Sequence, residues 1–468
     1  MTRSSTTSSA ELLVELRHRS GVGPLHQQLE HGLRSAIASG RLEPGAALPS
    51  SRMLAEQLAV SRGVVVEAYE QLVAEGYLAS NRGGRTTVGP RVSGSADDEP
   101  EEIERPAYRI DFAYGRPDVT EFPRAAWLRS LRRVLNDAPS ERLSYIDARG
   151  APELRFAIAA YLNRVRGTAA GGERVVICNG FAQGIGLVAQ MLAANGARRI
   201  ATEDPGQLDA PDAAARFRLE SVPIPVDEEG ISVSALERAD ADAVVVTPAH
   251  HFPTGAVLSA SRRAALLAWA GRGHRLIIED DYDAEYRYDR EPIGSLQGLA
   301  PDRVIYAGSA SKTLAPGLRL GWLIAPGPLV RQLAAVKMAN DRGSASLEQL
   351  ALADFLQTGE FDRHLRRMRI VYRDRRAALL AALQRYAPGL TPAGASAGLH
   401  VVAWLPDGID EAEVIDRAAG LGVRMPGISR QYLGNAARRP GLLFGYGKPG
   451  AKEIDEGVRL VAEALGAG

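Results

Sequence analysis

The chain has 468 residues, carries no net charge, and contains 45% hydrophobic and 24% charged residues, a composition ordinary for a globular protein. We expect no membrane span, because no stretch approaches the roughly 18 consecutive apolar residues that one requires. The polar segment from Met1 to Ala10 is unlike a secretory signal, and the single cysteine, Cys178, excludes an internal disulfide framework. These features predict a cytoplasmic protein.

Arginine supplies almost all of the positive charge. Of 56 basic residues only four are lysines. A lysine in this chain therefore suggests amine chemistry, because a primary amine forms a Schiff base and a guanidinium does not. The first 90 residues hold nine arginines against eight glutamates, so DNA binding must depend on where those arginines lie.

Composition divides the chain into two blocks. Residues 89–107 are polar, acidic and proline-bearing, which is typical of a flexible linker. We therefore predict one domain over residues 1–88 and another over residues 108–468.

Three short helices and a hairpin are predicted in the first block. The third helix buries apolar residues at helical spacing, and its polar first turn presents Ser61, Arg62 and Gly63. A recognition helix meets the major groove and the flanking phosphates in this way. The predicted elements cover residues 24–39, 49–58, 61–75 and 78–88.

The first block resembles the GntR family of winged helix-turn-helix regulators. The match includes Gly40-Arg-Leu-Glu-Pro-Gly, Leu48-Pro-Ser-Ser-Arg52, Leu58-Ala-Val-Ser61-Arg62 and Glu67-Ala-Tyr-Glu-Gln-Leu. The resemblance implies that operator DNA is a partner. It assigns DNA contacts to Arg52, Ser61, Arg62 and Gly83. The alternative is an adaptor domain whose arginines are only solvated.

Strands alternate with helices in the second block. This order predicts a doubly wound, mostly parallel α/β sheet followed by a small C-terminal α/β subdomain. The strands are expected at residues 175–178, 199–202, 243–247, 276–279, 304–307, 320–324, 400–404 and 442–446. The helices are expected at residues 183–194, 261–271, 346–357 and 360–386.

One segment of the second block suits a phosphorylated aldehyde. Ser309 and Ser311 are expected to donate hydrogen bonds to phosphate oxygens, and Arg319 supplies a forked cation. Lys312 would form the imine. We expect a nearby cation to lower the pKa of Lys312 and so favour the free amine.

Two further segments complete this candidate site. Asp280 and Tyr282 follow a strand and point the same way, which suits a protonated pyridine nitrogen and a ring oxygen. The strand-to-helix turn that contains Gly180, Phe181 and Ala182 offers backbone amides to an anion.

With these motifs the second block resembles fold type I pyridoxal-phosphate enzymes of the aminotransferase I group, over about residues 110–465. Supporting segments are Tyr145-Ile-Asp-Ala-Arg-Gly150 and Pro253-Thr-Gly. The resemblance implies pyridoxal 5'-phosphate (PLP) on Lys312, the pyridine nitrogen on Asp280 and the ring oxygen on Tyr282. It also implies a homodimer in which Tyr145 reaches the phosphate of the neighbouring subunit.

Both blocks together resemble the MocR subgroup of GntR regulators, which typically form head-to-tail homodimers. Phe252 stands where an asparagine usually precedes Pro-Thr-Gly, and Gln207 stands where the subgroup commonly has a ring-stacking aromatic. Because a transaminase should tolerate these losses poorly, we expect sensing and not catalysis. Arg424 and Arg430 are both candidates for an effector carboxylate, and the sequence does not choose between them.

The leading interpretation is a DNA-binding transcription regulator in which PLP, or its aldimine with an amine or amino acid, is the effector. Its targets would be genes of vitamin B6 or of amino-acid and amine metabolism. The alternative is an aminotransferase that carries a DNA-binding head. In a third interpretation the second block only dimerises the head. No metal is expected.

Overall fold

The computed structural model describes residue 16 and residues 23–80, 85–90, 108–288, 293–394, 397–434 and 438–466. It divides into two compact units, Met1–Arg105 and Pro106–Gly468. The predicted contact at Gly83 and most of the predicted linker lie outside the described residues. No helix within the described ranges is long and apolar enough to cross a membrane.

The N-terminal unit consists of three helices and a β-hairpin. The apolar face of the first helix packs on the third, where Leu33, Val65 and Leu72 are fully buried. The Ser50 hydroxyl caps the second helix by accepting a hydrogen bond from the amide of Met53. These elements confirm the predicted ones and are α1 (Leu25–Ala38), α2 (Ser51–Gln57), α3 (Arg62–Ala74), β1 (Leu78–Ser80) and β2 (Thr86–Val88).

The C-terminal unit is built around an eight-stranded sheet with the order β4–β11–β10–β9–β8–β5–β6–β7. The strands from β10 to β6 are parallel, whereas β11 is antiparallel to β10 and β4, and β7 is antiparallel to β6. The bounds are β4 (Val175–Cys178), β5 (Arg199–Asp204), β6 (Glu220–Asp227), β7 (Gly230–Ile231), β8 (Ala243–Val246), β9 (Leu276–Asp281), β10 (Val304–Ser309) and β11 (Gly321–Ile324). The predicted doubly wound, mostly parallel fold is confirmed.

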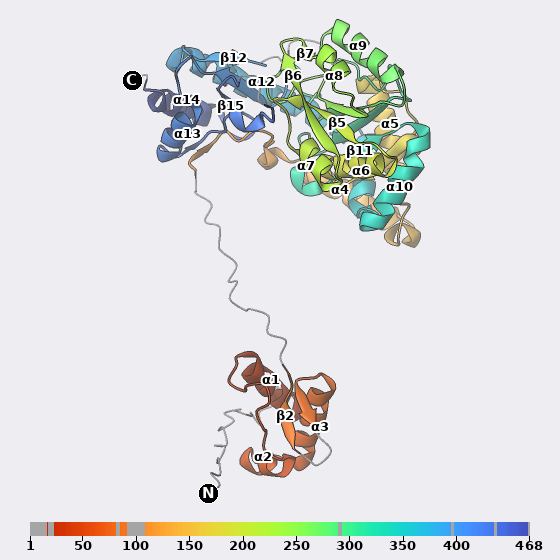
Figure 1. Ribbon diagram of the computed structural model, residues 1–468, viewed down its shortest axis with the longest axis vertical. Coiled ribbons are helices and arrows are strands. Elements are labelled where there is room, and N and C mark those ends of the chain that lie inside the picture. Colours follow the sequence, from red (N-terminus) through yellow and green to blue (C-terminus); the bar gives the residue numbers. More distant parts are fainter. Residues whose placement is uncertain are drawn as a thin grey trace. The chain divides into compact units, whose positions relative to one another are not determined.

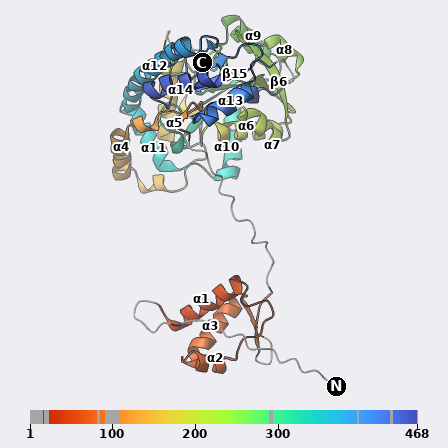
Figure 2. The same cartoon turned by 90° about the vertical axis from the view of Figure 1, so that its left-hand side faces the viewer.

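Helices cover both faces of this sheet, because successive residues of each strand point to opposite sides. In β4, Val176 and Cys178 share a core with α6, α7 and α10, whereas Val175 and Ile177 share one with α5 and α11. Both views draw α6, α7 and α10 along one side and α8 and α9 along the other (Figure 1, Figure 2). The bounds are α4 (Arg124–Asp137), α5 (Pro152–Arg166), α6 (Phe181–Ala194), α7 (Asp209–Arg216), α8 (Val233–Arg238), α9 (Ala260–Gly271), α10 (Gly327–Asp341) and α11 (Ser346–Gln357).

A smaller subdomain follows the long helix α12 (Glu360–Tyr386). Its antiparallel sheet has the order β12–β13–β15. The first strand of the whole unit, β3 (Ile110–Asp111), belongs to this subdomain, because it pairs in parallel with β14 (Val423–Arg424). The remaining bounds are β12 (Thr391–Ala393), β13 (His400–Trp404), α13 (Glu411–Gly420), β15 (Gly441–Gly445) and α14 (Ala451–Ala464).

Candidate cofactor site and DNA-binding surface

A cavity of about 330 Å³ lies next to the carboxyl ends of β9 and β10. Residues that directly follow these two strands line it, and open α/β sheets commonly bind their ligands at this edge. The charged and aromatic residues of its wall are Tyr114, Asp209, Phe252, Tyr282, Asp283, Lys312 and His400.

Asp280 lies in β9 with its side chain withdrawn from water. The residue is 3% exposed, and its Oδ2 atom has no hydrogen-bond partner among the described residues. Burial, with the neighbouring carboxylates of Asp281 and Asp209, raises the pKa of Asp280 well above its usual value. A buried carboxyl oxygen without a partner is costly, so this position fits a ligand that brings its own proton donor.

Asp281 points to the other side of the strand, as expected from the alternation of side chains. Its Oδ2 accepts hydrogen bonds from Arg166 at 2.6 Å and from the Tyr306 hydroxyl at 2.7 Å. Arg166 and Asp281 are both buried. This ion pair fixes the end of β9 from behind the cavity.

The amine of Lys312 enters the cavity from the segment that follows β10. Its Nζ donates a hydrogen bond of 2.7 Å to the carbonyl of Gly115. Gly115 has a φ of +69°, and a Cβ there would lie 3.0 Å from that Nζ, so only glycine lets the lysine approach so closely.

Burial lowers the pKa of Lys312, and this cause differs from the expected one. We expected a nearby cation to produce the shift. The charged groups that act on Lys312 are instead the carboxylates of Asp283, Asp280 and Asp209, which oppose the effect of burial. The expectation was wrong because Arg319, close in sequence, points away to the carbonyl of Asn179.

Tyr282 is part of a hydrogen-bonded network on one wall. Its hydroxyl lies 3.1 Å from Nδ1 of His250, and the same nitrogen lies 3.1 and 3.2 Å from the two carboxylate oxygens of Asp283. His250, Asp283 and His400 have ligand-type atoms within 4.8 Å of one another. Such a spacing could accommodate a metal ion. However, Nδ1 of His250 already takes part in the contacts with Tyr282 and Asp283. No sequence motif pointed to His250 beyond its place before Phe252.

The aromatic wall of the cavity consists of Tyr114 and Phe252, whose ring centroids are 4.9 Å apart. Gln207 also lines the cavity and donates a hydrogen bond of 2.6 Å to Asp209. The structure therefore places two aromatic rings in a cavity where the sequence suggested that an aromatic had been lost.

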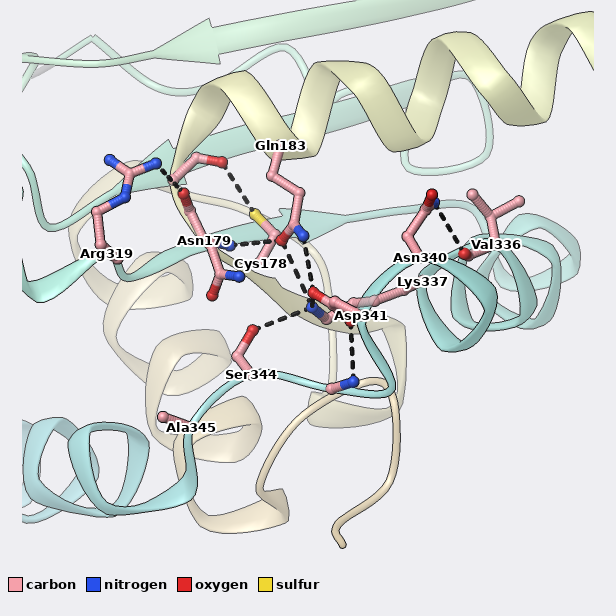
Figure 3. Close-up of polar contacts among 12 residues, drawn as sticks. Cys178, Asn179, Gln183, Arg319, Val336, Lys337, Asn340, Asp341, Ser344 and Ala345 are labelled. Carbon is pink, nitrogen blue, oxygen red and sulfur yellow. Dashed lines mark hydrogen bonds and ion pairs between the residues drawn. The ribbon is translucent and has the colours of Figure 1, made fainter. Parts of the chain in front are cut away.

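The turn before α6 brings the predicted anion site together. Gly180 is the N-cap residue with a φ of +88°, and Phe181 and Ala182 open the helix, where backbone amides lack intrahelical partners. Arg319 donates to the carbonyl of Asn179, as Figure 3 shows. A Cβ on Gly180 would lie 3.2 Å from the Arg319 guanidinium, so this glycine keeps the cradle open.

The two predicted serines lie on the adjoining strand and loop. Ser309 pairs with Gly321 across β10 and β11, and a Cβ on Gly321 would lie 2.8 Å from the Cα atom of Gly180. Both Ser309 and Ser311 are half-buried. The fold thus brings Ser309 beside the helix N-terminus that follows Gly180.

A second lysine, Lys337 on α10, supports this turn from behind (Figure 3). Its side chain is 0% exposed, and its Nζ lies 2.6 Å from Oδ2 of Asp341, 3.0 Å from Ser344 Oγ and 3.5 Å from Gln183 Oε1. Gln183 Oε1 in turn accepts a hydrogen bond of 2.7 Å from the amide of Asn179. Among so few lysines, this residue could have been singled out from the sequence.

Of the predicted cofactor- and effector-site residues, Tyr282 and Lys312 line the cavity itself, and Tyr145, Arg424 and Arg430 belong neither to its lining nor to the strand ends and the turn beside it. Tyr145 is 89% exposed, as expected of a side chain that serves a neighbouring subunit. Arg424 and Arg430 are exposed and do not line the cavity, although their charges act on the hydroxyl of Tyr114 and lower its pKa, against the larger effect of burial. The roles of these three residues stay predictions.

In the N-terminal unit, the predicted DNA contacts that the structure describes lie at the starts of helices α2 and α3. Arg52 lies in the first turn of α2, and Ser61 and Arg62 begin α3; all three are exposed. The Ser61 hydroxyl makes no capping hydrogen bond, so it can meet a phosphate. Arg62 reaches back to the hydroxyl of Ser51 at 3.4 Å, which links the two helix starts.

Comparison with known proteins identifies both units. Residues 25–88 match the bacterial regulatory proteins of the gntR family, and residues 110–413 match aminotransferase class I and II. The chain is 34% identical to the probable rhizopine catabolism regulatory protein MocR of Rhizobium meliloti, over 94% of each chain. It is 35% identical to the pyridoxine biosynthesis transcriptional regulator PdxR of Corynebacterium glutamicum, over 90% of this chain and 91% of that one.

The chain belongs to the MocR subgroup of GntR-family regulators. A solved multiple substrate aminotransferase from Thermococcus profundus superposes with a TM-score of 0.72 at 27% identity, covering 78% of this chain and 92% of its own. Since a MocR-type regulator shares its C-terminal fold with enzymes, the residues around Lys312 must decide what the cavity does.

Proposed function

We propose that this MocR-type chain is a transcription regulator that holds PLP on Lys312 and responds to PLP itself or to an amine or amino acid. The observation that carries the proposal is the buried Asp280 carboxyl, whose Oδ2 has no partner among the described residues and which acts electrostatically on the amine of Lys312. When bound, PLP supplies a carbonyl that condenses with primary amines and a ring that withdraws electrons.

Each side of the cavity suits one part of this cofactor. Asp280 would accept a hydrogen bond from the protonated pyridine nitrogen, and the resulting charge pair would offset the cost of burying the carboxylate. Tyr282 would donate a hydrogen bond from its hydroxyl to the ring oxygen, and Lys312 would supply the amine that holds the cofactor. The phosphate is held by Ser309, Ser311, Arg319 and the amides that follow Gly180, at Phe181 and Ala182.

The remaining assignments concern the assembly. Tyr145 would complete the phosphate site of a second copy, so the working unit is a homodimer, arranged head to tail. Residues 1–88 form the DNA-binding domain, 89–107 a flexible linker, and 108–468 the sensing domain. Arg52, Ser61, Arg62 and Gly83 contact operator DNA, and Arg424 or Arg430 receives an effector carboxylate.

Sensing requires no turnover. An effector shifts an equilibrium between two conformations when it binds one of them more tightly. Gln207 and Phe252 leave the cavity with a polar amide where the MocR subgroup commonly has a ring-stacking aromatic, and with an apolar ring where an asparagine usually precedes Pro-Thr-Gly. The relatives named for rhizopine catabolism and for pyridoxine biosynthesis support genes of vitamin B6 or of amine and amino-acid metabolism as its targets.

Binding of the full chain to DNA from upstream of its own gene, followed by fluorescence anisotropy with and without PLP, tests the proposal. We expect PLP or an amine to change the affinity or the footprint in the wild type but not in Lys312→Ala. Arg62→Ala should weaken DNA binding in both states. Complete absence of specific DNA binding, combined with sustained transamination, would show an enzyme instead. If PLP and amines leave DNA binding by both wild type and Lys312→Ala unchanged, the C-terminal unit serves only to dimerise the DNA-binding domain.

A further inference from the structure

The cavity around Lys312 is negatively charged. Among its described lining residues the formally charged side chains are two carboxylates, Asp209 and Asp283, and the amine of Lys312. His400 also lines it, but burial and the neighbouring His250 lower the pKa of His400 to about 4, so the imidazole is neutral near pH 7. Once Lys312 holds the cofactor, only the carboxylates keep formal charge on this wall.

The two carboxylates differ in what faces them. Both oxygens of Asp283 lie within 3.2 Å of Nδ1 of His250, so this carboxylate has a partner. Asp209 receives only the neutral amide of Gln207, and no basic side chain among the described residues lies within ion-pairing distance of it. The negative charge of Asp209 nevertheless acts to raise the pKa of both Lys312 and Asp280.

Helix capping does not account for Asp209. Asp209 and Asp212 both lie in the first turn of α7, where a carboxylate interacts favourably with the helix dipole. Asp212 is exposed and lines only a neighbouring groove, whereas Asp209 also faces the cavity. The helix dipole alone does not require that Asp209 be half-buried or that it line the cavity that contains Lys312.

An independent feature of the same cavity also favours a ligand rich in hydrogen-bond donors. The carbonyl of Gly115 lines the cavity and accepts its hydrogen bond from Lys312 Nζ. When that nitrogen is used to hold the cofactor, its donor protons are lost to Gly115. The carbonyl of half-buried Gly115 is then free to accept a hydrogen bond from a donor group of the ligand.

We propose that the effector is a primary amine that carries a second cationic group, and that Asp209 recognises this second cation. The inference rests on the proposed function, because the first amino group is the one directed at the cofactor. A linear diamine and a diamino acid share this chemistry. They differ in a carboxylate, which Arg424 or Arg430 would receive, since the charges of both arginines act on the hydroxyl of Tyr114 in the cavity wall.

Matched ligands test the second cation directly. The full-length protein is loaded with PLP, retention is confirmed by absorbance and by borohydride trapping on Lys312, and ligand dissociation constants are measured from the absorbance change and from the thermal midpoint. The probes are 1,4-diaminobutane against 4-aminobutanol and 4-aminobutanoate, and ornithine against norvaline. We expect each dication to bind at least about tenfold more tightly than its matched partners, which is about 1.4 kcal/mol.

Two variants of α7 distinguish recognition of the second cation by Asp209 from a general effect of negative charge on this helix. Asp209→Asn should reduce the preference for the dications to near one, while Asp212→Asn, one helical turn further on, should keep it. The double variant Arg424→Ala, Arg430→Ala should weaken ornithine and leave 1,4-diaminobutane unchanged if the natural ligand is a diamino acid. No loss for either ligand would point to the free diamine.

A wild-type protein that binds 4-aminobutanoate or norvaline as tightly as the dications would overturn the inference while the proposed function stands. The same holds if Asp209→Asn keeps the preference. Failure to retain PLP on Lys312 would overturn the proposed function, and this inference with it.

Discussion

Replacing Lys337 with methionine removes a fully buried ammonium group and leaves its neighbours in place. Lys337 Nζ lies 2.6 Å from Asp341, whose side chain is 21% exposed. Removing one partner of a fully buried ion pair costs about 3–5 kcal/mol. Asp341 is partly solvated and keeps hydrogen bonds from Gln183 at 2.7 Å and from the amide of Gly343 at 2.8 Å. We therefore expect a loss of about 2–3 kcal/mol, below that range.

Thermal unfolding of the full-length protein measures this loss. For large domains about 1 kcal/mol shifts the midpoint by roughly 2 °C, so the midpoint of the C-terminal unit should fall by roughly 4–6 °C. Lys448→Met is the matched control, because Lys448 is exposed and pairs with Asp111 at only 3.4 Å. Exposed pairs contribute about 0–1 kcal/mol, so its midpoint should barely move.

The pH dependence gives a second check on the same reasoning. Burial alone would raise the pKa of Asp341, but the hydrogen bonds from Lys337, Gly343 and Gln183 hold it below its usual value. A carboxyl with a lowered pKa contributes stability above its unfolded pKa of about 3.9 and loses it as the pH falls through the folded value. The gap between wild type and Lys337→Met should persist at neutral pH and shrink below about pH 4.

Cofactor binding reports the local consequence. Gln183 Oε1 joins Lys337 to the amide of Asn179 in the turn proposed to bind the phosphate, so PLP should bind Lys337→Met several-fold more weakly. A midpoint change no larger than that of Lys448→Met, with unchanged PLP affinity, would refute the reasoning.

Three further predictions concern other parts of the molecule. Because burial lowers the pKa of Lys312, its amine should react with an acylating reagent at pH 7.5 faster than that of Lys452, as peptide mass spectrometry of the PLP-free protein would show; equal rates would contradict this. Arg62→Ala should weaken DNA binding uniformly across sequences and reduce the salt dependence of the affinity by about one ion, measured from anisotropy titrations at several salt concentrations. Burial raises the pKa of Glu203 to about 8, so its ionisation destabilises the fold as the pH rises from about 4.3 toward 8. Glu203→Gln should flatten that decline in thermal midpoint, and a parallel decline in both proteins would count against it.

The sequence predicted the central strands because they are short runs of β-branched and aliphatic residues. It did not predict β6, which contains Pro223 and Pro225. Proline cannot donate to a β-ladder and is confined to strands near an edge. β6 meets that condition, because β7 covers it only at Val226 and Asp227.

The candidate site was predicted where its residues lie at a strand end or shortly after it. Asp280, Tyr282 and Lys312 could be found in this way because a strand end fixes where the next side chains point. Gly115 could not, because it lies 197 residues before Lys312 and no local motif surrounds it. The source of the Lys312 pKa shift was also beyond the sequence, since burial depends on the whole tertiary structure.

The pairing of β3 with β14 constrains how the protein can move. Ile110 and Asp111 are hydrogen-bonded into the small subdomain, and five residues after Ile110 the carbonyl of Gly115 holds the amine of Lys312. Five residues span at most about 17 Å, so Gly115 cannot move further than that from β3. The pairing of β3 with β14 thus links Gly115, which binds the amine of Lys312, to the small subdomain through only a few residues.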